Sequence, residues 1–209
     1  MTLQEYIASL RGRTVAVIGI GVSNTPLLRL LLREGIAVTA CDRSDRAKLG
    51  ALAEELEAAG AVLRLGDGYL QDLDQDVIFR TPGLRPDVPE LEAARAKGST
   101  ITSEMEVFFE VCPCPIIAVT GSDGKTTTTT IIAELLRAAG HTVHVGGNIG
   151  HPLLAEADTI RPTDWAVLEL SSFQLMTMTH SPHIAVVTNL APNHLDVHKS
   201  MEEYIWAKE

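Results

Sequence analysis

A glycine-rich loop between a strand and a helix constrains the fold of this chain more than any other feature of its sequence. The apolar run Ile116–Thr120 is followed by Gly-Ser-Asp-Gly-Lys-Thr at 121–126, and then by a helical pattern over Thr127–Ala139. A strand, a glycine loop and a helix in this order are typical of α/β folds in which a helix N-terminus faces an anion. The feature therefore predicts a parallel sheet with helices on its faces.

The residue types of this loop suit the binding of a nucleotide phosphate. Glycines allow the backbone angles that turn amide groups toward an anion. Lys125 is expected to reach the terminal phosphates and the Thr126 hydroxyl to ligate Mg²⁺, although the first glycine and the lysine are one position closer than in the standard phosphate loop. The alternative is a glycine turn with no ligand. We predict that ATP binds to Gly121, Ser122, Asp123, Gly124, Lys125, Thr126 and Thr127.

The first half of the chain also contains a strand, a glycine loop and a helix in that order. The loop Gly-Ile-Gly-Val-Ser-Asn at 19–24 follows a strand over Thr14–Ile18 and precedes a helix over Thr25–Arg33. Asp42 comes at the end of the next strand, as in dinucleotide-binding folds, but Asn24 replaces the third glycine of that motif. The loop is compatible with an NAD(P) site, with a site for another nucleotide, or with a structural turn.

The remaining pattern predicts two α/β domains. Further strands are expected over 36–40, 61–65 and 77–79 in the first half and over 142–145, 165–170 and 184–188 in the second, with helices over 48–59, 89–97 and from residue 200. Thr81-Pro82-Gly83 would lie at the carboxyl edge of the first sheet, where open α/β sheets bind ligands. Pro113 and Pro115 favour an extended linker. We therefore expect domains over residues 1–111 and 112–209.

Acidic and basic side chains at the strand ends of the second half suggest a metal site. Glu169 ends an apolar strand beside the phosphate loop and is placed to hold Mg²⁺. His194 follows the next strand, although taken alone it is more often structural, and Lys208 taken alone is a solvated helix lysine. The other histidines, His198 among them, are expected on the surface or in loops.

The three cysteines suggest nothing beyond packing, because Cys112-Pro113-Cys114 has too little reach to hold a metal alone.

Composition excludes several classes of protein. Hydrophobic residues make up 45% and charged residues 21% of the chain, which is a globular mixture. A net charge of −10 argues against a nucleic-acid partner, which would require a basic surface. The sequence holds no apolar stretch near the ~20 residues that a membrane helix needs, and no apolar core near its N-terminus for a signal peptide. We expect a cytoplasmic protein without a membrane partner.

Five segments together resemble the Mur ligase family, and the resemblance covers the whole chain. It implies a Rossmann-like UDP-sugar-binding domain over 1–111 and an incomplete ATP-binding central domain over 112–209. The segments Gly-Gly-Asn-Ile-Gly and Glu-Leu-Ser-Ser-Phe-Gln-Leu resemble those of the family member that adds D-glutamate. One departure is Asp123, where the family often has asparagine. The five segments are Gly121–Thr127, Gly146–Gly150, Glu169–Leu175, Thr188–Asp196 and Tyr204–Lys208.

The resemblance also implies roles for particular residues. Lys125, His194 and Lys208 would be catalytic, and Lys208 would carry a carbamate. Thr126, Glu169, His194 and the Lys208 carbamate would surround the metal. The residues implied to bind the substrate are Val22, Ser23, Asp42, Arg43, Gly83, Asn148, Ser171 and Gln174, with Asp42 near the uracil.

The implied reaction is the ATP-dependent and Mg²⁺-dependent addition of D-glutamate to UDP-N-acetylmuramoyl-L-alanine through an acyl phosphate, by a monomer, in peptidoglycan precursor synthesis. The alternatives are another Mur-type or folylpolyglutamate-like ligase, a nucleotide-binding module without turnover, and a dehydrogenase. Because the family continues with a third domain, we expect these 209 residues to be a fragment that binds the UDP-sugar but does not turn over alone.

Overall fold

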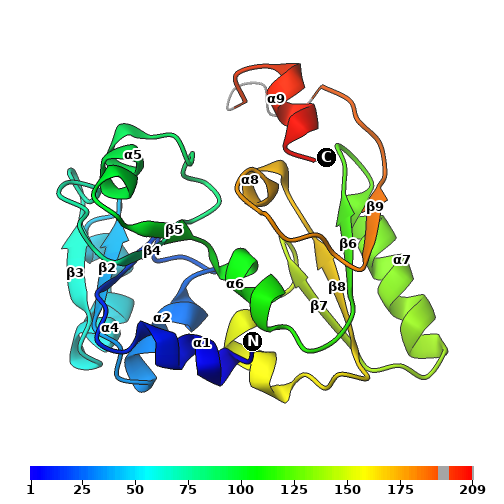
Figure 1. The fold of residues 1–209 in the computed structure, drawn as a ribbon, viewed down its shortest axis with the longest axis horizontal. Helices are drawn as coiled ribbons and strands as arrows, with labels where there is room; N and C mark the ends of the chain where they lie inside the picture. The colour runs from blue at the N-terminus through cyan, green and yellow to red at the C-terminus, as the bar shows by residue number, and fades with distance from the viewer. Residues whose placement is uncertain (193–197, 209) are drawn as a thin grey trace. The chain divides into compact units, whose positions relative to one another are not determined.

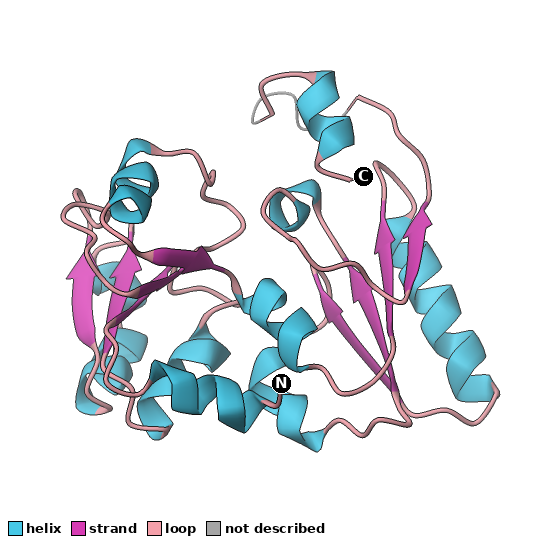
Figure 2. Cartoon of the chain, in the orientation of Figure 1, coloured by secondary structure: helices cyan, strands magenta, loops and turns pink. Residues whose placement is uncertain are grey.

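The computed structural model describes residues 1–192 and 198–208. The chain divides into two compact units, Leu3–Val107 and Phe108–Glu209. Each unit holds one sheet of parallel strands together with helices, which confirms the predicted α/β class (Figures 1 and 2). The assignment of residues 1–111 and 112–209 to a UDP-sugar domain and an ATP domain stays a prediction.

The first unit contains a five-stranded sheet with the order β3-β2-β1-β4-β5. Strands β1 and β4 are neighbours although β2 and β3 lie between them in the sequence. The strand order reverses at this point, and in open α/β sheets such a point is where ligands bind. The strands are β1 (Val15–Ile18), β2 (Val38–Asp42), β3 (Val62–Leu65), β4 (Val77–Phe79) and β5 (Thr100–Thr102).

Helices cover this sheet because their apolar residues recur at helical spacing. In α2 (Thr25–Arg33), the buried residues are Leu27, Leu28, Leu30 and Leu31, and this helix has the predicted bounds. All four residues of β1 are buried, as expected for a central parallel strand. The other helices of this unit are α1 (Leu3–Leu10), α3 (Arg46–Leu49), α4 (Ala51–Ala58) and α5 (Pro89–Ala96). Helix α6 (Glu104–Val111) contains the boundary between the two units, after Val107.

Two predicted elements of the first unit differ from the structure. The helix predicted over 48–59 is divided into α3 and α4 by Gly50, whose φ of +53° interrupts the helical backbone. Strand β2 begins two residues later than predicted, at Val38, and includes Asp42 at its end. Ile36 is buried in the preceding turn, so its burial does not mark a strand.

The second unit contains a four-stranded sheet with the order β7-β8-β6-β9, and the four predicted strands are confirmed. Helix α7 (Lys125–Ala138) begins two residues before the predicted start, directly after the left-handed Gly124. In the part of the chain that the structure describes, no helix is long and apolar enough to cross a membrane. The other elements are β6 (Ile116–Thr120), β7 (Val143–Gly147), β8 (Trp165–Glu169), β9 (Ile184–Val187), the 3₁₀ helix Leu154–Thr159, α8 (Ser172–Leu175) and α9 (Met201–Trp206).

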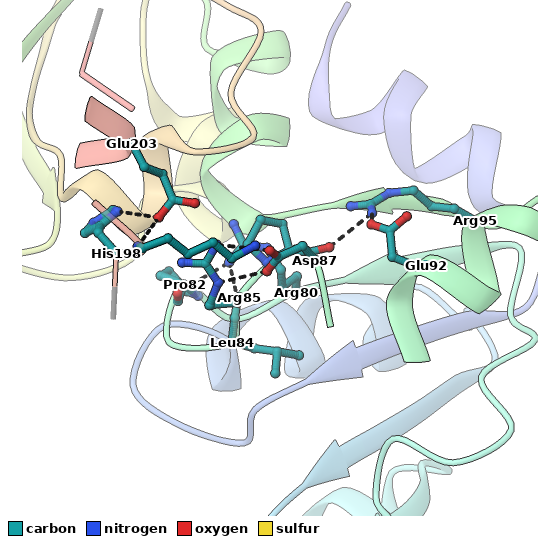
Figure 3. A network of polar contacts seen from close by, with 11 residues as sticks. Arg80, Pro82, Leu84, Arg85, Asp87, Glu92, Arg95, His198 and Glu203 are labelled. Carbon is teal, nitrogen blue, oxygen red and sulfur yellow. Dashed lines mark hydrogen bonds and ion pairs between the residues drawn. The ribbon is translucent and has the colours of Figure 1, made fainter. Parts of the chain in front are cut away.

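Arg80 holds the loop that follows β4 in the first unit. Its side chain is 1% exposed, and its guanidinium donates hydrogen bonds to the carbonyl oxygens of Thr81, Pro82 and Leu84 (Figure 3). Burial lowers the pKa of this guanidinium below its ordinary value. Arg80 therefore fixes the shape of the loop that carries Gly83 at the carboxyl edge of the sheet.

Replacing Arg80 by methionine is expected to lower the free energy of unfolding by about 2 kcal/mol, because three carbonyl groups lose a donor while the apolar stem is retained. Urea unfolding measures the change. The control is Arg29→Met, which removes the exposed ion pair with Glu55 and is expected to cost much less, because exposed ion pairs contribute little to stability. Equal losses in the two variants would show that Arg80 has no anchoring role.

Candidate nucleotide and metal site

The predicted phosphate loop lies between β6 and α7 in the second unit (Figure 1). Gly121 has a φ of +142°, and a Cβ atom there would lie 2.0 Å from the hydroxyl of Thr188, so glycine is required at this position. Gly124 is left-handed and turns the chain into α7. The first N–H groups of α7 have no acceptor within the helix, and they carry a partial positive charge. This geometry suits an anion.

The segment after β9 supports the phosphate loop from one side. The backbone N–H groups of Ser122 and Asp123 donate to the backbone and side-chain oxygens of Asn189, at 3.1 and 3.0 Å. The Thr188 hydroxyl donates to the carbonyl of Asp123 at 2.6 Å. Two of the N–H groups in the predicted ATP-binding stretch therefore hold the loop to the protein. The N–H groups of the first turn of α7 are better placed to donate hydrogen bonds to phosphate oxygens.

Lys125 folds back over its own loop. Its ammonium donates to the carbonyl oxygens of Gly121 at 3.0 Å and Ser122 at 2.9 Å. The positive charge is thus held directly at the loop, where phosphate oxygens would replace these carbonyl acceptors. ATP binding by the loop residues stays a prediction.

Glu169 joins the ends of β8 and β7 to the start of α7. Its carboxylate is 2% exposed and accepts hydrogen bonds from the Thr126 hydroxyl at 2.7 Å and from the Asn148 side chain at 2.8 Å. The backbone N–H of Asn148 also donates to the carbonyl of Glu169 at 2.8 Å. The sequence-predicted residues Thr126, Asn148 and Glu169 are therefore brought together at one sheet edge.

The oxygen atoms of Thr126 and Glu169 fit Mg²⁺, which prefers oxygen ligands and retains several waters or phosphate oxygens. Within residues 1–192 and 198–208, no group of three or more His, Cys, Asp or Glu side chains could hold a metal by itself. Binding of a divalent ion by Thr126 and Glu169 stays a prediction. Of the two other predicted ligands, His194 lies outside the described residues, and the Lys208 carbamate stays a prediction.

Lys208 reaches the phosphate loop from α9. Its ammonium donates to the Thr120 hydroxyl at 2.9 Å and to the carbonyl of Gly121 at 3.2 Å, and it lies 4.8 Å from the centre of the Tyr204 ring. Burial, and then the nearby charge of Lys125, lower the pKa of Lys208 to about 8. The local sequence alone predicted a solvated helix lysine at this position. That expectation is wrong, because the chain at the end of α9 brings the Lys208 side chain to β6.

Tyr204 fixes α9 to the loop. Its hydroxyl lies 2.9 Å from the Ser122 hydroxyl, which in turn donates to the carbonyl of Ala191 at 2.7 Å. Tyr204 is 1% exposed. The Ser122 side chain therefore connects protein segments, and this connection positions Lys208.

His198 connects α8 with α9 and was missed by the sequence analysis. It lies in a loop, as expected, but is only 2% exposed. Its Nε2 atom is 2.8 Å from the Ser172 hydroxyl, and its ring stacks on Phe173 and meets Tyr204 edge-on. Its Nδ1 atom is 3.5 Å from the Glu203 carboxylate (Figure 3). No local pattern marks this residue, because its partners come from two separate helices.

A cavity of about 200 Å³ lies among these elements. Ser171 lines it and caps α8 together with Gln174, whose side-chain oxygen accepts from the Ser171 N–H at 3.0 Å. Gln174 is 7% exposed and is not among the lining residues. The candidate residues in the lining are Gly121, Lys125, Asn148, Ser171 and Lys208.

In the first unit, the loops after β1 and β4 touch. A Cβ atom on Gly19 would lie 2.9 Å from the Cβ of Thr81, so the two loops approach closely only because residue 19 is glycine. Asn24 is 2% exposed and donates to the carbonyl of Ile18 at 2.9 Å, so it packs where the dinucleotide motif has its third glycine.

Asp42 organises the first of these loops. Its carboxylate accepts from the N–H of Ile20 at 2.6 Å and from the N–H of Ser44 at 2.6 Å. The predicted contacts Val22, Ser23, Arg43 and Gly83 are exposed. Their roles, and a contact of Asp42 with uracil, stay predictions.

The lowered pKa of Lys208 predicts a pH-dependent stability. The unfolded chain keeps the Lys208 proton up to about pH 10.5, whereas the folded chain releases it near the folded pKa of about 8. Unfolding free energy should therefore rise as the pH increases from 8 to 10.5. The comparison is with Lys208→Met, and both proteins are measured in buffer free of carbon dioxide. The unfolding free energy of the wild type should rise by on the order of 2 kcal/mol more than that of the variant, once the effect is reduced for solvent screening. Parallel curves for the two proteins would contradict this prediction.

Comparison with known proteins finds relatives of this chain. Residues 119–209 match the Mur ligase middle domain family. The chain is 54% identical to a UDP-N-acetylmuramoylalanine–D-glutamate ligase of Acetivibrio thermocellus, over 99% of this chain and 45% of that protein. A protein of the same name from Clostridium botulinum is also 54% identical, over 94% of this chain and 43% of the relative. The chain thus spans less than half the length of these curated relatives.

Solved structures of similar fold lead to the same group of proteins. The UDP-N-acetylmuramate:L-alanyl-γ-D-glutamyl-meso-diaminopimelate ligase of Neisseria meningitides has a TM-score of 0.55 at 21% identity, covering 93% of this chain and 66% of that one. The UDP-N-acetylmuramate-alanine ligase of Thermotoga maritima has a TM-score of 0.52 at 22% identity, covering 93% and 46%. At these identities the likeness concerns the fold. The sequence matches mean that the chain belongs to the Mur ligase family.

Proposed function

We propose that the chain supplies the UDP-sugar and ATP sites of an amide ligase that adds D-glutamate to UDP-N-acetylmuramoyl-L-alanine in the synthesis of peptidoglycan precursors. One observation carries the proposal: Lys125, the Thr126–Glu169 pair and Lys208 surround a single phosphate loop. The chain is 54% identical to proteins named UDP-N-acetylmuramoylalanine–D-glutamate ligase, and this identity supports the proposed substrates.

The proposed reaction begins with two anions that repel each other, the alanyl carboxylate and the γ-phosphate of ATP. Lys125 and the N-terminus of α7 offset this repulsion at the transferring phosphoryl group. Mg²⁺, held by Thr126 and Glu169, would add positive charge at the phosphate oxygens. Transfer of the γ-phosphoryl group to the carboxylate gives an acyl phosphate, and ADP leaves. The amine of D-glutamate attacks the acyl phosphate, and the tetrahedral intermediate collapses to the amide with loss of phosphate and a proton.

Titration of the chain with UDP-N-acetylmuramoyl-L-alanine tests the proposed substrate. We expect it to bind more tightly than UDP-N-acetylmuramate, which lacks the alanyl group, and we expect no binding of NAD(P)H. Preference for UDP-N-acetylmuramate would favour another member of the family. Binding of NAD(P)H without the UDP-sugar would favour a dehydrogenase and overturn the proposal.

The proposed metal site is tested by Thr126→Val. This variant removes the hydroxyl that contacts Glu169, so ATP binding should lose its dependence on Mg²⁺. The matched control is Thr130→Val on the same helix, where the exposed hydroxyl donates only to the carbonyl of Thr126. Unchanged Mg²⁺ dependence in Thr126→Val would remove Thr126 from the proposed ligand set.

We also propose that Lys208 carries a carbamate. A pKa of about 8 leaves a useful fraction of neutral amine at physiological pH, and carbon dioxide reacts with the neutral form. The carbamate would replace a cation with an anion beside the phosphate loop. With ¹³C-bicarbonate, we expect a carbamate NMR signal that is absent in Lys208→Met and retained in the exposed control Lys97→Met. A signal that survives Lys208→Met would contradict this assignment.

A further inference from the structure

The segment between α6 and β6 brings two thiol groups together. The sulfur atoms of Cys112 and Cys114 lie 3.6 Å apart, and neither residue lines the cavity at the phosphate loop. Cys112 is partly exposed, whereas Cys114 is 2% exposed. We propose that Cys112 and Cys114 form a redox-active dithiol, which closes to an intramolecular disulfide by exchange with a small-molecule disulfide. The sequence alone suggested only packing for these residues.

The two cysteines differ in a way that gives them separate roles. The thiol of Cys114 acts as the hydrogen-bond partner that lowers the pKa of Cys112. The same hydrogen bond, followed by burial, raises the pKa of Cys114. A thiolate is the attacking form in disulfide exchange, and a small disulfide meets the thiol that solvent reaches. Cys112 is partly exposed whereas Cys114 is 2% exposed, so Cys112 is the entry point and Cys114 the resolving group.

The reaction balances with one equivalent of the small disulfide. The Cys112 thiolate attacks one of its sulfur atoms, and a mixed disulfide forms while one thiolate leaves. Cys114 then gives up its proton to solvent and attacks the sulfur of Cys112, so the second small thiolate leaves. The protein dithiol is oxidised by two electrons, and the small disulfide is reduced to two thiols.

Closure of the disulfide requires a short movement of the two sulfur atoms. They must approach from 3.6 Å to about 2.05 Å. Pro113 fixes its own φ near about −65° and limits the conformations of the intervening residue. Backbone hydrogen bonds hold the chain on both sides of this segment. The N–H of Cys112 donates to the carbonyl of Phe108 at 2.9 Å, and the N–H of Ala166 donates to the carbonyl of Pro115 at 3.0 Å.

Intact-mass measurement after treatment with oxidised glutathione tests this proposal. The wild-type chain should lose two hydrogens and retain no glutathione, and dithiothreitol should reverse the change. Cys114→Ser should retain one glutathione on Cys112, because the resolving thiol is absent. Cys112→Ser should react at least ten times more slowly. Cys41→Ser is the control and should behave like wild type, since Cys41 is 0% exposed and burial raises its pKa to about 11.

Three results would overturn the proposal: retention of glutathione by the wild-type chain, three unreacted thiols, or a disulfide that includes Cys41. A second variant, Cys114→Ala, guards against a local packing defect caused by serine. Both variants at position 114 should trap the same adduct while keeping the far-ultraviolet circular dichroism of the wild type. A trapped adduct in neither variant would count against Cys112 as the entry point.

Discussion

Replacing Lys125 by alanine is expected to weaken the binding of MgATP by about 100-fold, because charge-assisted hydrogen bonds to phosphate contribute about 1.5–3 kcal/mol. The lysine ammonium already lies against the loop, 3.0 Å from the carbonyl of Gly121. It therefore needs only a change of acceptor to contact a phosphate.

Calorimetric titration with ATP and with AMP separates this effect from misfolding. AMP lacks the terminal phosphates that Lys125 is proposed to contact, so its affinity should change little. The matched control is Lys97→Ala, which removes the same charge from an exposed position in the first unit. Equal losses of ATP and AMP affinity in Lys125→Ala would point to a damaged loop. Retained ATP affinity would place the phosphates elsewhere.

The phosphate loop was predictable because its signals are local. The strand Ile116–Thr120, the two glycines and the following helix are adjacent in the sequence, and the structure reproduces them in that order. The position of Glu169 at the end of β8 followed from the same reasoning, since carboxyl ends of parallel strands share one edge. Its contact with Thr126 agrees with that reasoning.

Other parts of the site depend on contacts between distant segments. Lys208 and Thr120 are 88 positions apart, and the hydroxyls of Ser122 and Tyr204 are 82 positions apart. Such contacts require the chain to have already folded back on itself, and no short pattern encodes them. The family resemblance alone singled out Lys208, because a terminal helix lysine has no local feature that predicts burial.

The bounds of the elements failed where a single residue altered the backbone. Gly50 divides one predicted helix into two because its φ is positive, although the flanking residues favour a helix. In α1, Leu3, Ile7 and Leu10 are buried at helical spacing, and a search for that period would have found the helix. Backbone geometry at Gly50 explains the first difference, whereas α1 carries its signal in the spacing of its apolar residues.

Replacing Gly147 by alanine is expected to lower the free energy of unfolding by about 4 kcal/mol, the sum of left-handed backbone strain and steric overlap in a packed interior. Gly147 has a φ of +94°, and its Cβ would lie 2.2 Å from the carbonyl oxygen of Glu169. That oxygen belongs to the backbone of the paired strand β8, so it cannot rotate away as a side chain would. Relief requires β7 and β8 to separate.

Gly140→Ala isolates the contribution of the overlap. Gly140 has a similar φ of +90°, but a Cβ there would meet no atom within 4 Å, so only the backbone strain of about 1–2 kcal/mol remains. Separation of β7 from β8 would also draw Asn148 away from the Glu169 carboxylate, so MgATP affinity should fall in Gly147→Ala and stay constant in Gly140→Ala. If urea unfolding shows equal destabilisation of the two variants, β7 and β8 separate at little cost in free energy. Glu169 would then owe its position to Thr126 rather than to the close approach that Gly147 allows.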